Sequence, residues 1–162
     1  MQSITIRIKK GKDGPHALVC ERADGSMTMQ RHATGFFPVH DLMHYAVETS
    51  FGYRRGFYGL IADGWNLEDF GVPWPRGRLP ADLDPVELVV GALSLEGATG
   101  ERMTAEKVNW TIASWYEQHV PGVAVPSVTD DRLDASRVEI ARLQQRWFAL
   151  PPGDAIELTF PA

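Results

Sequence analysis

The hydrophobic period of this chain changes twice, and these changes constrain the fold more than any other feature. Residues 3–8 alternate apolar and polar side chains, and two further strand-like runs at 16–22 and 26–31 are joined by an Asp-Gly turn. The middle of the chain then repeats its apolar residues at helical spacing, and the two-residue alternation returns at 155–160. Because strands and helices are segregated, with no βαβ repeat, the sequence predicts an α+β fold.

The simplest arrangement of these segments is an antiparallel sheet of about four strands, three N-terminal and one C-terminal. Four to five helices would cover one face of this sheet. A length of 162 residues is usual for one domain, and no repeat, linker or low-complexity segment divides the chain. We therefore expect residues 1–162 to form a single domain.

Composition excludes several classes of function. The net charge is −5 and no basic stripe stands out, so we expect no nucleic-acid partner. Cys20 is the only cysteine, which rules out an intrachain disulfide and a cysteine-rich zinc module. The sequence MQSITIRIKK is not a signal peptide, and no stretch is apolar enough for a membrane span. These features predict a cytoplasmic protein without a membrane partner.

The segment at 38–51 concentrates the chemistry of the chain. A proline that can open a helix and the following Gly52 predict a helix there. On a helical wheel His40, Asp41, His44 and Glu48 fall within a sector of about 100°, while most of the remaining circumference is apolar. A largely buried helix therefore keeps one polar strip made only of histidine and carboxylate side chains.

This strip suits a metal site. His40 and His44 are four residues apart, so both imidazoles can converge on one divalent ion, with zinc as the first expectation. Asp41 and Glu48 are the candidate catalytic carboxylates. Glu48 lies about 12 Å along the axis from His40, so we expect it to hydrogen-bond to His44 rather than share the ion. Any third ligand must come from elsewhere in the chain.

The sequence offers several third ligands without choosing among them. We consider His32 and Asp63 first, and the remaining candidates are His16, Glu68 and Asp69.

Three resemblances concern the same region. The run HDLMH resembles the H-E-x-x-H motif of zinc hydrolases with Asp41 in place of the glutamate, which implies a metal-dependent hydrolase. The His40-Asp41 pair is also similar to that of HD phosphohydrolases, although those enzymes are all-helical. The run HDLMHYAVETSFGYRRGFYGLIADGW and the closing LPPGDAIELTF are similar to an uncharacterised family of small stand-alone bacterial proteins. That last resemblance implies no activity.

Other interpretations remain open at this point. The histidines could serve only in ion pairs, His44 with Glu48 or with Asp41. Arg54 and Arg55 could form an anion-binding pocket, and His40 with Arg54 could hold a small anionic ligand without metal.

A non-enzymatic alternative rests on the aromatic loop, residues 65–75, which contains two tryptophans, Trp65 and Trp74. This loop, or a free sheet edge, could mediate protein interaction or homo-oligomer assembly. We thus expect a small metal-binding protein, as a candidate metal-dependent hydrolase, with an assembly module as the alternative.

Overall fold

The computed structural model describes residues 3–161, and its strands form one antiparallel sheet in the order β3-β2-β1-β4. Strands β1 (Ile4–Lys9), β2 (His16–Arg22) and β3 (Met27–His32) form a meander, and β4 (Ala155–Phe160) pairs with β1. Each strand begins within one residue of its predicted start. The structure therefore confirms the α+β fold, with three N-terminal strands and one C-terminal strand.

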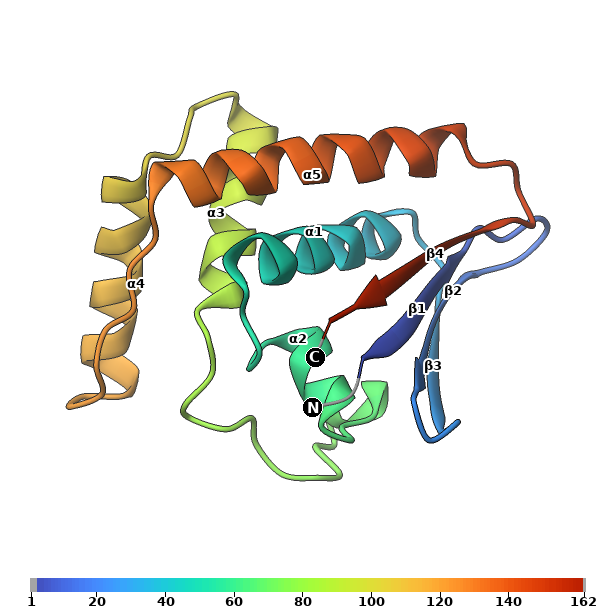
Figure 1. Cartoon of the computed structure of the whole chain (residues 1–162), viewed down its shortest axis with the longest axis horizontal. Coiled ribbons are helices and arrows are strands. Elements are labelled where there is room, and N and C mark those ends of the chain that lie inside the picture. The colour runs from blue at the N-terminus through green and yellow to red at the C-terminus, as the bar shows by residue number, and fades with distance from the viewer. Residues whose placement is uncertain (1–2, 162) are drawn as a thin grey trace.

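The helices fall between β3 and β4, and Figure 1 shows them on one side of the sheet. They are α1 (Phe36–Phe51), α2 (Phe57–Ala62), the 3-10 helix η1 (Leu67–Phe70), α3 (Val86–Thr99), α4 (Ala105–His119) and α5 (Asp130–Ala149). The aromatic loop, expected to be irregular, thus contains the short helix η1.

Helix α1 starts earlier than the sequence predicts, and α3 lacks the cap that the pattern Asp84-Pro85-Val86-Glu87 predicts, in which Asp84 caps the helix and Glu87 completes a capping box. Helix α1 begins at Phe36, before Pro38, because a proline in the first turn has no hydrogen-bonded N–H to lose. Helix α3 begins at Val86, and Asp84 does not cap it. The Asp84 carboxylate instead accepts hydrogen bonds from the backbone N–H groups of Arg54 and Arg55, at 2.9 and 2.8 Å.

Helix α1 lies between two hydrophobic clusters and contributes to both. Its Leu42 and Ala46 pack with the inward side chains of the sheet, including the Ile4, Ile6 and Ile8 face predicted from the alternation of β1. Its Met43 and Val47 pack with α3, α4 and the start of α5. Figure 1 shows α5 running alongside α1. Of the polar strip of α1, Asp41, His44 and Glu48 are buried and His40 is half-buried.

A bidentate ion pair joins α3 to α5. Arg137 donates to both carboxylate oxygens of Glu96 at 2.7 Å and to the carbonyl of Met103 at 2.6 Å. This hydrogen bonding lowers the pKa of Glu96 to about 2. A carboxyl whose folded-state pKa is depressed stabilises the fold above its unfolded pKa of about 4.3, and that stabilisation disappears as pH falls towards the folded value.

Replacing Glu96 with glutamine is therefore expected to lower the free energy of unfolding at pH 7 by about 1–2 kcal/mol, because water partly screens the pair. The difference from the unsubstituted protein should shrink between pH 5 and pH 3. Urea denaturation across this range measures it, with Glu139→Gln as the matched control. Glu139 holds Arg142 in a more exposed pair, for which about 0.3–0.5 kcal/mol is expected at pH 7. Equal losses in both variants, or a loss independent of pH, would contradict the prediction.

Candidate metal centre

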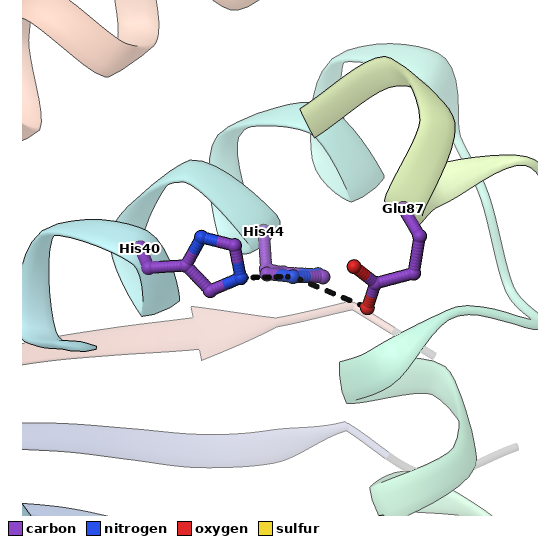
Figure 2. Close-up of side chains that lie close together, drawn as sticks. All are labelled: His40, His44 and Glu87. Carbon is purple, nitrogen blue, oxygen red and sulfur yellow. Dashed lines mark hydrogen bonds and ion pairs between the residues drawn. The ribbon is translucent and has the colours of Figure 1, made fainter. Parts of the chain in front are cut away.

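His40 and His44 meet one turn apart on α1, as the sequence predicted, and Glu87 joins them from α3. The two Nε2 atoms are 3.1 Å apart, and the Nε2 atom of His44 is 3.4 Å from Oε1 of Glu87. One ligand atom from each residue lies within 4.8 Å of the other two. Figure 2 shows the three side chains pointing toward one another.

The packing of α3 against α1 places Glu87. Val86, Val89 and Val90 of α3 are buried in the cluster that includes Met43 and Val47 of α1. This contact fixes the first turn of α3 beside the polar strip of α1. Glu87 in that turn then reaches His44, although 72% of its side chain is exposed to solvent.

Two of the three ligand separations are close to those that one metal ion requires. Zinc binds imidazole nitrogen at about 2.0–2.1 Å, so two nitrogens at a tetrahedral angle are about 3.3–3.4 Å apart. The Nε2 atoms of His40 and His44 are 3.1 Å apart, and Nε2 of His44 is 3.4 Å from Oε1 of Glu87. The ligand atoms of His40 and Glu87 lie within 4.8 Å of each other, so the Glu87 carboxylate would have to bridge that separation for all three to ligate one ion.

The two imidazoles are held in the form that binds metal. Burial, with a smaller effect from His44, lowers the pKa of His40 to about 4. Burial also lowers the pKa of His44. Both rings are therefore neutral at pH 7, and one Nε2 atom donates a hydrogen bond to the other across their 3.1 Å contact. Coordination of one ion by both Nε2 atoms would require that proton to move to Nδ1 of the same ring, with no change in the net charge of the pair.

Glu48 supports His44 from behind. Its side chain is fully buried, and its carboxylate accepts hydrogen bonds from the backbone N–H groups of Tyr58 and Gly59 at 3.1–3.2 Å. Its Oε1 lies 3.8 Å from Nδ1 of His44, too far for the predicted hydrogen bond, and the buried Nδ1 atom has no hydrogen-bond partner among the described residues. Burial raises the pKa of Glu48 to about 8.

Two glycines allow close packing around the start of α2. A Cβ atom at Gly56 would lie 2.7 Å from the Glu48 carboxyl carbon, and one at Gly59 would lie 1.9 Å from the carbonyl oxygen of Arg54. Gly56 therefore lets the chain approach Glu48, and Gly59 lets α2 pack against the backbone of Arg54.

Asp41 belongs to a different contact from His40 and His44. Its Oδ2 faces Nε2 of His32 at 3.6 Å, and both side chains are buried. Burial raises the pKa of Asp41 to about 7 and lowers that of His32. The ring of His32 also stacks on that of Phe37, with 4.6 Å between the ring centroids. The structure therefore brings His32, a predicted third ligand, to Asp41 rather than to the histidine pair.

The other predicted third ligands also lie outside the cluster. Asp63 is exposed just after α2, and Glu68 is exposed in η1. Asp69 accepts the backbone N–H of Asn66 at 2.7 Å and so caps η1. His16 accepts the N–H of Gly11 at 3.0 Å.

The predicted anion site and aromatic loop have their own contacts. Arg55 donates to Asp82 at 2.8 Å, whereas the guanidinium of Arg54 lies 5.9 Å above the ring of Phe160. Their role in anion binding stays a prediction. In the aromatic loop Trp65 is buried, while Trp74 is half-buried.

Sequence reasoning missed Glu87, which it assigned to a capping box of α3. One signal could have found it: the run VELVVGALSL is apolar nearly all round, so a lone carboxylate in its first turn is conspicuous. The capping role disappears because α3 has no side-chain cap.

Comparison with protein-family models, with curated proteins and with solved structures gives no match. No helix within residues 3–161 is long and apolar enough to cross a membrane. A proposal about function must therefore rest on the geometry of the candidate metal centre.

Proposed function

We propose that this protein binds one divalent metal ion through His40, His44 and Glu87. The observation that carries the proposal is the convergence of two neutral imidazole nitrogens and a carboxylate oxygen within 4.8 Å of one another. Two histidines and one glutamate form a ligand set of zinc hydrolases. The same set also suits Fe(II), and we favour zinc because two of the three ligand separations are close to those of a tetrahedral site.

We further propose that the bound ion supports hydrolysis. Three protein ligands leave a coordination position open, and the exposed side chain of Glu87 places the centre at the surface, where substrate can reach it. A zinc ion in such a site lowers the pKa of bound water to about 7 and polarises a carbonyl or phosphoryl group.

In this proposal the two predicted catalytic carboxylates have different roles from an H-E-x-x-H base. Glu48 acts as a positioning residue for His44, since its carboxyl group is held by backbone N–H groups of α2 and lies 3.8 Å from Nδ1 of that ring. Asp41 is paired with His32. In this proposal neither Asp41 nor Glu48 acts as the catalytic base. The bound ion, held by His40, His44 and Glu87, would supply the hydrolytic chemistry.

Metal content tests the binding proposal. Protein purified without a histidine tag and dialysed against micromolar zinc is expected to retain about one ion per chain, since a three-ligand site holds a single ion. His40→Ala and His44→Ala should each lose it, while His119→Ala, an exposed histidine on α4, should not. Absence of zinc from the unsubstituted protein, or equal retention in all variants, would overturn the proposal.

Hydrolysis is tested separately with p-nitrophenyl acetate and bis(p-nitrophenyl) phosphate. Activity on one of these substrates should disappear with EDTA and return with added zinc. Metal-loaded protein that is inactive on both would remove the hydrolase part and leave metal binding intact. The alternative assembly role of the aromatic loop stays a prediction.

A further inference from the structure

A pocket of about 490 Å³ opens beside the metal centre. It lies between the chain segment at 74–85, the first turns of α3 and the end of α4. Its volume is within the range of small-molecule sites. Glu87 belongs both to the wall of this pocket and to the candidate metal centre, whereas His40 and His44 do not line the pocket. A molecule in the pocket would therefore approach the candidate centre from the side of Glu87.

The walls of the pocket are apolar and aromatic. Leu88 of α3 faces Trp115 and Tyr116 of α4 across it, and Trp74 adds a second indole from the aromatic loop. Trp115 stays 38% exposed and stacks on His119 at 4.6 Å. Flat exposed rings of this kind bind apolar or aromatic groups by stacking and burial.

Hydrogen bonds fix the shape of these walls. The hydroxyl of Tyr116 donates to the carbonyl of Leu83 at 2.9 Å, which ties α4 to the segment preceding α3. Asp84, in the same segment, is held by the two N–H groups of Arg54 and Arg55. The pocket is therefore formed without a ligand, which lowers the cost of binding.

Arg78 supplies the pocket with a guanidinium that can bind an anion. Arg78 lines the pocket and forms no ion pair with the residues that the structure describes. Of the two carboxylates in the lining, Asp84 is occupied by backbone donors, and Glu87 faces His44. A guanidinium without a partner at the edge of an apolar pocket binds a carboxylate, sulfonate or phosphate group well.

We propose that this pocket binds a small molecule with an aromatic or apolar body and one anionic group, and that it presents this molecule to the metal centre. The second part rests on the proposed function. The substrate class is thus a small amphipathic acid. A second pocket, of about 540 Å³, contains none of the three candidate ligands in its lining.

Two fluorescent probes test the pocket without any metal. In EDTA, 1-anilinonaphthalene-8-sulfonate and its uncharged analogue N-phenyl-1-naphthylamine should both bind with increased fluorescence. Arg78→Gln should weaken binding of the sulfonate by about fivefold to tenfold, the effect of one lost charged contact, and leave the uncharged probe within about twofold. Trp115→Ala should weaken both probes, because it removes an aromatic wall.

Arg31→Gln, an exposed arginine on β3, is the matched control and should leave both probes unchanged. Circular dichroism confirms that each variant is folded. The proposal is overturned if neither Arg78→Gln nor Trp115→Ala changes probe binding, or if Arg31→Gln weakens the sulfonate as much as Arg78→Gln does.

Paramagnetic relaxation tests the link to the metal centre. With Mn²⁺ bound, the ¹⁹F relaxation of 4-(trifluoromethyl)phenylacetate should increase, and His40→Ala, which leaves the pocket lining intact, should abolish the increase. Probe binding without enhanced relaxation in Mn²⁺-loaded protein would overturn the link. Failure of Mn²⁺ to bind would overturn the metal site itself, while the titrations in EDTA still decide the pocket.

Discussion

Replacing Glu48 with alanine is expected to lower the free energy of unfolding by about 3–5 kcal/mol, the largest stability effect that we predict for a single side chain. The carboxyl group of Glu48 is fully buried and accepts the backbone N–H groups of Tyr58 and Gly59. Alanine leaves both buried donors without an acceptor, at about 1–3 kcal/mol each, and opens a cavity between α1 and α2.

Urea denaturation followed by circular dichroism measures this loss. Glu48→Gln keeps the volume and one acceptor oxygen, and because burial raises the pKa of Glu48 to about 8, the native side chain is already mostly uncharged at pH 7. The free energy of unfolding should therefore fall less in Glu48→Gln than in Glu48→Ala, by about 1–2 kcal/mol. Glu68→Ala, an exposed glutamate in η1, is the control and should stay within about 0.5 kcal/mol. A Glu48→Ala protein as stable as this control would contradict the described packing.

Replacing Glu87 with alanine is expected to weaken zinc binding by about 100-fold or more, since four-ligand zinc sites bind with about 10–16 kcal/mol in total and each ligand carries a share of it. The stability of the metal-free protein should hardly change, because the side chain of Glu87 is 72% exposed and caps no helix. Calorimetric titration with zinc and urea denaturation in EDTA measure the two quantities.

Glu106→Ala provides a matched control, since Glu106 is an exposed glutamate in the first turn of α4. It should leave both zinc affinity and stability unchanged. Zinc affinity that is equal in Glu87→Ala and Glu106→Ala would remove Glu87 from the metal centre.

Local patterns predicted the elements and half of the site. Alternation located the strands, and the spacing of His40 and His44 on one helix was enough to bring their rings together, because both facts depend only on the geometry of a single segment. Glu87 could not be assigned in the same way. Its place beside His44 depends on how α3 packs against α1, which is a contact between segments more than 40 residues apart in the sequence.

The helical wheel also grouped residues that the tertiary structure separates. Asp41 is about 100° from His40 around α1, enough for it to face His32 of β3 while His40 and His44 face α3. Glu48 does lie beside His44, but its carboxylate is taken by the backbone of α2. Residues that lie close together on the wheel therefore face three different elements, β3, α3 and α2. The sequence of α1 alone does not reveal these neighbours.

Anomalous diffraction at the zinc edge tests the metal centre most directly. Crystals grown with one equivalent of zinc should show one strong peak, about 2.0–2.2 Å from Nε2 of His40, Nε2 of His44 and a carboxylate oxygen of Glu87. A peak bound instead to Asp41 and His32, or no peak in zinc-containing crystals of folded protein, would contradict the account.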